Sequence, residues 1–249
     1  MKYLLCILGA WFGFANPVYQ LPVLVLLFPA ALASIGLTSE SRKEALFHGW
    51  LAGMLTFSAC LYWVALPVHN FGPLPWLLSA TCPLLLGVYF GLYTGAFALA
   101  VQWAGNRLPW LLLAPFAGLI WTVLEYLRAH LLTGFPWLSL SQAFSPWPAV
   151  IQIVAYIGAF GLSGLLVAIA VWLVQTADIK IAFVPALLAT VLVLATGYGL
   201  IQKPLPQGPE ARVAVVQGNI DQARKWDREY QENTVNKYLR LSSDVLDDT

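Results

Sequence analysis

The sequence predicts an α-helical membrane protein with about seven transmembrane helices, followed by the first strand and helix of an incomplete α/β domain. Hydrophobic residues make up 59% of the 249 residues and charged residues only 10%, whereas soluble domains carry roughly 25% charged residues. Of the 25 charged residues, 11 fall within residues 1–203 and 14 within the last 46. This step in charge density predicts a change from membrane to water-soluble chain near residue 203.

Seven apolar runs support the membrane assignment, because a bilayer core takes about 20 helical residues. The first run has only 13 residues, about 20 Å as a helix. It has two interpretations: a signal peptide with a small-residue cleavage site, or half of a helical hairpin that turns at Asn16 and Pro17. The runs are 3–15, 18–37, 45–66, 74–104, 108–128, 148–176 and 181–201.

The basic residues between these runs predict the orientation, because Lys and Arg concentrate in cytoplasmic loops. They lie at the N-terminus and in the second, fourth and sixth connections, as Lys2, Arg42, Lys43, Arg107 and Lys180. We therefore expect a multi-pass protein of the bacterial inner membrane with a cytoplasmic N-terminus. Residues after about 203 are then expected in the periplasm.

Three regions follow from these patterns: a transmembrane domain at 1–203, a linker at 204–210 and the start of a soluble domain at 211–249. The linker is rich in proline and should be semi-extended. The β-branched run 212–216 is typical of a buried strand, and 228–246 has the polar face of a surface helix. Because domains usually need at least about 50 residues, we expect 211–249 to be only the beginning of one.

Glu125 and Arg128 are the first candidate site residues, since ionisable groups within membrane segments are costly and often functional. They lie three residues apart near the outer end of their helix, close enough to pair on one face. Two roles remain open. The pair could anchor the loop that follows, or it could contact a lipid head group.

Two uncharged loops lie on the predicted outer side. The first contains Phe135, Pro136 and Trp137; its aromatic residues could be ordinary interfacial belt residues or could guide acyl chains towards a site above the bilayer. The second contains His69, which we expect to bond a head group or the backbone rather than to act as a catalyst. In the soluble segment Trp226 lies between Lys225 and Asp227, a pattern typical of packing or of a surface.

Several kinds of site are not predicted. The net charge of +1 offers no basic surface for nucleic acid, and the segment 217–219 lacks the glycine spacing of a phosphate-binding loop. The cysteines and histidines show no metal-ligand spacing, and the cysteines are expected to be small buried hydrophobes. We therefore predict no metal and no cofactor; the residues concerned are Cys6, Cys60, Cys82, His48, His69 and His130.

Four segments together resemble the bacterial apolipoprotein N-acyltransferase family. They are VAVVQGNIDQARKWD at 213–227, EYLR at 125–128, TGFPWL at 133–138 and the stretch HNFG at 69–72. The resemblance covers essentially the whole chain. One departure is SLSQAF at 139–144, where the family has a glycine-tyrosine-serine-glutamine run, so the register of this loop stays open.

The resemblance implies transfer of an acyl chain from a phospholipid donor to the N-terminal diacylglyceryl-cysteine of a lipoprotein. It implies a periplasmic, nitrilase-like domain with a Glu-Lys-Cys triad, in which cysteine carries the acyl group as a thioester and glutamate acts as general base. No catalytic residue is predicted within this chain, because the triad is expected beyond Thr249; the chain alone should be inactive. Trp226 and Trp137 carry over as substrate-handling residues.

Two other classes of function stay open beside the acyltransferase. One is a lipid-binding or transport protein without enzymatic activity, in which the membrane helices themselves work. Against it, Glu125 and Arg128 alone offer ionisable groups within the helices, and no inverted repeat is visible. The other is a scaffold whose C-terminal tail binds a partner.

Overall fold

The computed structural model describes residues 1–72, 74–203, 208, 213–221, 225 and 227–246. The chain divides into two compact units, Met1–Lys203 and Pro204–Thr249, which are treated separately below. Among the described residues the regular structure is entirely helical. This confirms the helical class of the first 203 residues.

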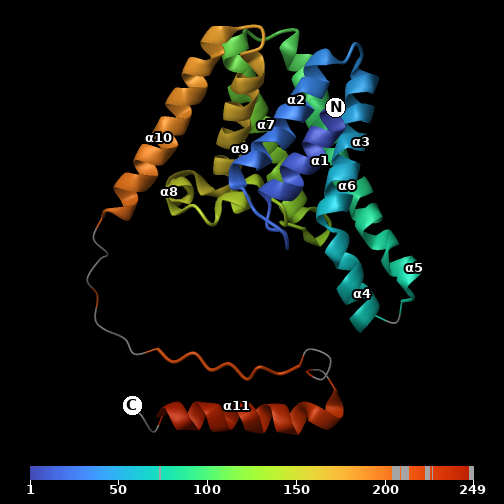
Figure 1. Cartoon of the computed structure of the whole chain (residues 1–249), viewed down its shortest axis with the longest axis vertical. Coiled ribbons are helices and arrows are strands. Elements are labelled where there is room, and N and C mark those ends of the chain that lie inside the picture. The colour runs from blue at the N-terminus through green and yellow to red at the C-terminus, as the bar shows by residue number, and fades with distance from the viewer. Residues whose placement is uncertain (73, 204–207, 209–212, 222–224, 226, 247–249) are drawn as a thin grey trace. The chain divides into compact units, whose positions relative to one another are not determined.

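The first unit is a bundle of helices (Figure 1). Its longer helices are α1 (Lys2–Gly13), α2 (Leu27–Thr38), α3 (Arg42–Cys60), α4 (Ala65–Phe71), α6 (Thr81–Gly105), α7 (Trp110–His130), α9 (Val154–Gln175) and α10 (Phe183–Ile201). Short turns connect them: η1 (Pro22–Leu26), η2 (Tyr62–Val64), α5 (Trp76–Ser79), η3 (Leu131–Thr133), η4 (Leu140–Phe144), α8 (Pro148–Ile151) and η5 (Lys180–Ala182). In Figure 1, α4 and α5 extend beyond one end of the bundle.

Small residues allow the central helices to approach closely. A Cβ atom added to Gly53 of α3 would lie 1.8 Å from Thr94 Oγ1 of α6, so the two helices touch there with no room for a side chain. At the crossing of α7 and α9, a Cβ on Gly118 would lie 2.4 Å from the Gly164 carbonyl oxygen. Glycine at helix contacts is typical of membrane bundles, where packing rather than the hydrophobic effect holds helices together.

The two ends of the bundle differ in charge. At one end, Lys2 Nζ donates hydrogen bonds to the Ser34 carbonyl, at 3.0 Å, and to Thr38 Oγ1. The C-terminal end of α6 lies at the same end, because a Cβ on Gly105 would lie 2.6 Å from Leu37. Lysine and arginine therefore gather where α1 starts and where α2 and α6 end. The last turn of α7 lies at the opposite end.

The membrane spans agree only partly with the seven predicted. Within the part of the chain that the structure describes, four segments are long and apolar enough to cross a bilayer: Trp76–Gly105, Trp110–Thr133, Val154–Gln175 and Lys180–Ile201. A bent pair, Arg42–Cys60 with Tyr62–Phe71, would raise this to five, with a bend of 54° between its halves. The first two predicted spans appear as shorter apolar helices, Lys2–Gly13 and Pro22–Thr38. The seven crossings thus stay a prediction, since 12 helical residues reach only about 18 Å.

In the second unit, the predicted strand is not present in the described residues 213–216. Residues 213–220 have no regular secondary structure, and Val213 and Val215 are 81% and 89% exposed. A strand needs the backbone of a neighbouring strand for its hydrogen bonds, and the described residues supply none. The predicted helix is present, as η6 (Arg228–Tyr230) and α11 (Gln231–Leu246). The nitrilase-like start stays a prediction; Trp226 and nearly all of the predicted linker lie outside the described residues.

Candidate functional site

The last turn of α7 brings the two charged candidates into the interior of the helical unit. Glu125 and Arg128 are three residues apart and share one helix face. Their exposed fractions are 4% and 3%. Charged groups are rarely buried to this extent unless other groups compensate them. The contacts of these two side chains therefore indicate their role.

Glu125 binds the start of the segment that follows the loop. Its Oε1 atom accepts hydrogen bonds from Trp121 Nε1 at 3.0 Å and from the Leu140 backbone N–H at 2.9 Å. The Ser163 hydroxyl of α9 accepts a hydrogen bond from the Ser141 backbone N–H at 3.0 Å, so the same segment is also bound to α9. Because Leu140 is the first residue of η4, the carboxylate fixes η4 against the end of α7.

Arg128 holds the other side of the loop. Its guanidinium carbon lies 5.4 Å from the centroid of the Phe57 ring and 4.9 Å from that of Phe90, which are cation–π distances. Its carbonyl oxygen accepts a hydrogen bond from the Phe135 N–H at 3.1 Å. Residues Pro136 to Ser139 are thus held between two attachments to the last turn of α7.

The pairing of Glu125 and Arg128 expected from their spacing takes a different form. No direct hydrogen bond or ion pair joins them, and Glu125 Oε2 and Arg128 Nη1 have no hydrogen-bond partner among the described residues. The carboxylate turns towards the backbone of Leu140, whereas the guanidinium turns towards two aromatic rings. These contacts favour the loop-anchoring role over contact with a lipid head group, because both side chains are buried.

A series of aromatic contacts links Arg128 to the end of α3. The Phe90 and Phe135 rings are 5.4 Å apart, and Phe135 lies 5.8 Å from Trp137. Trp137 stacks on Trp63 of η2 with ring centroids 4.8 Å apart and an angle of 30°. Offset stacking of this kind contributes about 0.5–1.5 kcal/mol beyond the area that it buries. The loop is therefore tied to α6 and to η2 as well as to α7.

The backbone before and within the loop is strained. Leu132, Thr133 and Leu138 have φ angles of 52°, 75° and 60°, where residues with side chains are uncommon. Gly134 has φ 77°, and a Cβ there would lie 2.0 Å from the Ala129 carbonyl oxygen. Such conformations persist only when surrounding contacts fix them, and they concentrate at functional sites.

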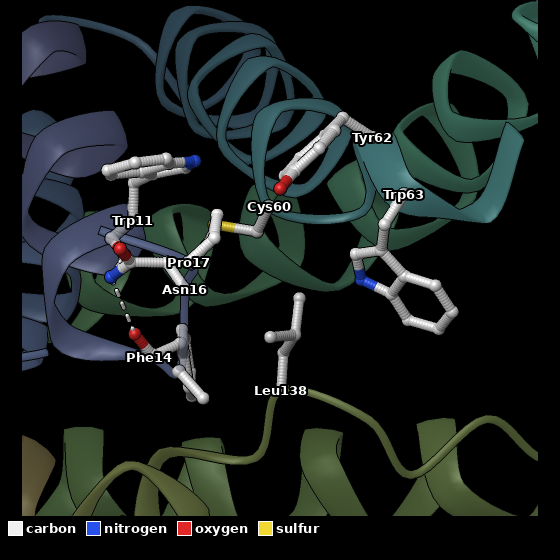
Figure 2. A pocket seen from close by; sticks show the side chains of 9 residues that line it. Trp11, Phe14, Asn16, Pro17, Cys60, Tyr62, Trp63 and Leu138 are labelled. Atoms are coloured by element: carbon white, nitrogen blue, oxygen red, sulfur yellow. Dashed lines mark hydrogen bonds between the residues drawn. The ribbon is translucent and has the colours of Figure 1, made fainter. Parts of the chain in front are cut away.

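An uncharged cavity opens beside the loop (Figure 2). Its volume is about 340 Å³, and its walls come from the end of α1, the end of α3, η2 and the loop: Trp11, Phe14, Ala15, Asn16, Pro17, Cys60, Tyr62, Trp63 and Leu138. A second cavity of about 330 Å³ shares five of these residues and adds Pro136, Trp137 and Gln142. Both volumes lie at the lower end of the range for small-molecule sites.

The walls of these cavities suit binding rather than catalysis. Cys60 and Tyr62 carry the nucleophilic groups among the lining residues, and no histidine, lysine or carboxylate lines either cavity to activate them. Figure 2 shows Asn16 beside the first cavity, where its amide donates to the carbonyl oxygens of Trp11, Phe14 and Tyr19 at 2.8–3.2 Å. The amide stabilises the turn after α1, and the uncharged walls of the cavity suit an apolar or weakly polar group.

The structure brings most of the predicted site residues together. Glu125, Arg128, Phe135 and Trp137 form the connected cluster described above, and the Pro136 carbonyl accepts hydrogen bonds from Ser139 Oγ and Gln142 Nε2, both at 3.2 Å. His69 belongs to a separate place, the turn between α4 and α5. There its ring stacks on Trp76 at 4.0 Å, and Nδ1 lies 2.9 Å from the Leu74 carbonyl oxygen.

The sequence interpretation missed several residues of the site. Trp11, Trp63 and Cys60 line the cavity, and Phe57 lies under Arg128. No local signal distinguishes them from ordinary residues of apolar helices, since they come from segments that are distant along the chain. Cys6 and Cys60 are buried, as predicted, whereas Cys82 is half-buried. Among the described residues, no group of three His, Cys, Asp or Glu side chains could hold a metal ion.

The fold and the site together define a helical bundle with several segments apolar and long enough to cross a membrane. An aromatic loop and two uncharged cavities lie at the end of the bundle opposite Lys2 and Gly105. Residues 8–172 match the model of the apolipoprotein N-acyltransferase N-terminal domain. The chain belongs to the apolipoprotein N-acyltransferase family. The family assignment made from the four sequence segments is thus confirmed.

Similar proteins extend the match beyond residue 172. The chain is 36% identical over 212 residues to the apolipoprotein N-acyltransferase of Geobacter metallireducens, covering 82% of this chain and 40% of that protein. It is 33% identical over 248 residues to the Shewanella oneidensis apolipoprotein N-acyltransferase, covering 97% and 46%, and 34% identical over 249 residues to that of Vibrio vulnificus, covering 96% and 47%. The chain spans less than half the length of these relatives.

Proposed function

We propose that this chain is the membrane portion, with the start of the soluble domain, of an apolipoprotein N-acyltransferase. The complete protein would transfer an acyl chain from a phospholipid to the free amino group of the diacylglyceryl-cysteine of lipoproteins. The observation that carries the proposal is the loop with Phe135, Pro136 and Trp137, which the last turn of α7 holds beside an uncharged cavity of about 340 Å³. The family assignment supports it independently.

In this proposal, residues outside 1–249 carry out the chemical step of acyl transfer. In the proposed scheme a nitrilase-like domain beyond residue 249 carries a Glu-Lys-Cys triad. The cysteine thiolate attacks an ester carbonyl of the phospholipid, the ester C–O bond breaks, and the lysophospholipid leaves with a proton returned by the glutamate. The amine of the acceptor then attacks the thioester carbon, the C–S bond breaks, the cysteine leaves as thiolate, and the glutamate takes the proton of the amine. Separating acyl transfer into two steps through a cysteine is the usual advantage of nucleophilic catalysis. Residues 1–249 would bind and position the substrates and would not turn them over alone.

The proposed substrates explain the chemistry of the site. Acyl chains need uncharged walls, and every residue that lines the two cavities is uncharged. Phe135, Pro136 and Trp137 would guide the acyl chain, while Glu125 and Arg128 would hold the loop in place. His69 would bond a head group near the same membrane face. Trp226, in the soluble segment, would also handle substrate.

We further propose the inner membrane as the location, with a cytoplasmic N-terminus and residues after about 203 in the periplasm. The distribution of basic residues supports this orientation. Lys2 lies against the C-terminal end of α2, and α6, which precedes Arg107, ends beside α2. The loop and its cavities lie at the opposite end of the bundle, where periplasmic substrates would reach them.

The experiment that tests the function uses protein purified from its source membranes. Intact mass and C-terminal peptide mapping first establish the full polypeptide. That polypeptide is then reconstituted with phospholipid and a diacylated lipopeptide, and mass spectrometry follows the gain of one acyl chain on the peptide. We expect transfer by the complete protein and none by residues 1–249 alone. Lipid binding without transfer by the complete protein would overturn the proposal in favour of a lipid-binding or transport protein.

A further inference from the structure

Two buried atoms of the α7 turn are without a partner. Glu125 Oε2 and Arg128 Nη1 have almost no contact with solvent and make no hydrogen bond to any described residue. Leaving a buried charged group unsatisfied costs more than the roughly 1–3 kcal/mol of a neutral one, so native structures nearly always supply a partner. The acceptor and the donor belong to residues three positions apart on one helix face.

A small cavity joins these two residues. It offers about 20 Å³ to water-sized molecules, and its walls are Phe57, Tyr93, Thr94, Trp121, Leu124, Glu125 and Arg128. One water needs about 10–15 Å³ measured in this way, together with two to four polar partners. The space therefore suits a single water and is too small for phosphate or a carboxylate ligand. The Glu125 carboxylate also disfavours an anion, and Arg128 disfavours a cation.

We propose that one ordered water molecule binds between Glu125 and Arg128 and bridges them. The water donates one hydrogen bond to Glu125 Oε2 and accepts one from Arg128 Nη1. A third partner is available, because the Tyr93 hydroxyl belongs to a wall residue and lies 2.6 Å from the Tyr89 hydroxyl. Three hydrogen bonds are the typical number for a buried water.

The bridge has a structural consequence for the loop. Glu125 binds the Leu140 N–H, and the carbonyl of Arg128 binds the Phe135 N–H. With the water in place, the carboxylate that binds Leu140 and the guanidinium that packs on Phe57 and Phe90 become one connected polar network. Such networks hold a unique geometry when every member is satisfied. The water would thus act as a positioning element for Trp137, whichever substrate the protein handles.

The direct test is a high-resolution structure of the protein in lipid. We expect one isolated density peak within about 2.7–3.2 Å of both Glu125 Oε2 and Arg128 Nη1, the range of ordinary hydrogen bonds. A cavity without density, or a direct contact between the two side chains, would overturn the proposal. So would density with the coordination distances of an ion.

A stability measurement provides a second, independent test. Leu124→Phe places a larger apolar side chain at the cavity wall, and Leu119→Phe, at a residue of α7 that is 63% exposed, is the matched control. Filling a dry cavity would raise the Tm, whereas expelling the water leaves Oε2 and Nη1 unsatisfied and should lower it by several degrees relative to the control. A higher Tm for Leu124→Phe than for Leu119→Phe would count against the bound water.

Discussion

The carboxylate of Glu125 accepts a hydrogen bond from the backbone N–H of Leu140 at 2.9 Å, across 15 positions of the chain. This contact makes a buried charge the anchor of a loop. A charge-assisted hydrogen bond is stronger than one between neutral groups, and here it lies among apolar helices, where water competes little for either partner. The geometry of the loop with Phe135 and Trp137 therefore depends on the last turn of α7.

Replacing the anchor should destabilise the helical unit strongly. Glu125→Ala removes the acceptor for Trp121 and Leu140 and leaves two buried N–H donors unsatisfied. We expect a loss of about 3 kcal/mol in the free energy of unfolding, because each unsatisfied buried donor costs about 1–3 kcal/mol. Glu125→Gln keeps the Oε1 acceptor and should lose less. Thermal unfolding in detergent measures both, and equal losses would show that the hydrogen bonds to Oε1 contribute nothing.

The strained backbone of the loop predicts that Gly134 cannot be replaced without a rearrangement. Gly134→Ala places a Cβ 2.0 Å from the Ala129 carbonyl at a φ of 77°, so the loop must rearrange. We expect faster proteolysis of residues 131–139 and a lower Tm. The control is Gly199→Ala in α10, where no atom lies within 4 Å of the added Cβ and alanine should stabilise the helix by about 0.5–1 kcal/mol. Similar behaviour of the two variants would contradict a strained loop.

The crossing of α7 and α9 should tolerate no side chain. Gly118→Val must separate the helices, because even a Cβ would lie 2.4 Å from the Gly164 carbonyl. Losing this contact also moves the Ser163 hydroxyl away from the Ser141 N–H that it binds, so we expect both a lower Tm and increased exposure of Trp137 to a fluorescence quencher. Gly199→Val serves as the control, and a Gly118→Val protein with unchanged Tm and quenching would refute the tight crossing.

The stacked tryptophans provide a test of the proposed substrate handling. In the complete protein, Trp137→Ala removes the stack on Trp63 and part of a cavity wall. We expect it to lower kcat/KM about tenfold, which corresponds to a loss of roughly 1.4 kcal/mol in transition-state stabilisation. Trp103→Ala is the control, since Trp103 lies near the basic end, beside Arg107. Equal activities of the two variants would remove Trp137 from the site.

Cysteine labelling tests the proposed orientation. In a background without Cys6, Cys60 and Cys82, Glu40→Cys lies at the basic end and Ser145→Cys follows the loop; both positions are exposed. A membrane-impermeant thiol reagent added to cells with a permeable outer membrane should label position 145 and spare position 40. Labelling of position 40 alone would invert the orientation, and labelling of both would mean that the two ends share one side.

The sequence by itself determined the helical class, the family and the charged and aromatic residues around which the candidate site is described. Long apolar runs are sufficient to predict helices, because a backbone in lipid must satisfy its hydrogen bonds internally. The segment at 213–216 marks the limit of this reasoning. A β-branched run predicts a strand, but strand formation depends on a neighbouring chain segment, and the described residues there are irregular.

Only the tertiary structure decided how the site is built. The spacing of Glu125 and Arg128 predicted a pair, yet each side chain found its partners on elements distant in sequence: Leu140 for the carboxylate, Phe57 and Phe90 for the guanidinium. The cavity beside the loop likewise combines residues of α1, α3 and η2 with Leu138. Helical periodicity specifies which residues share a face, whereas the packing of whole helices specifies what that face meets.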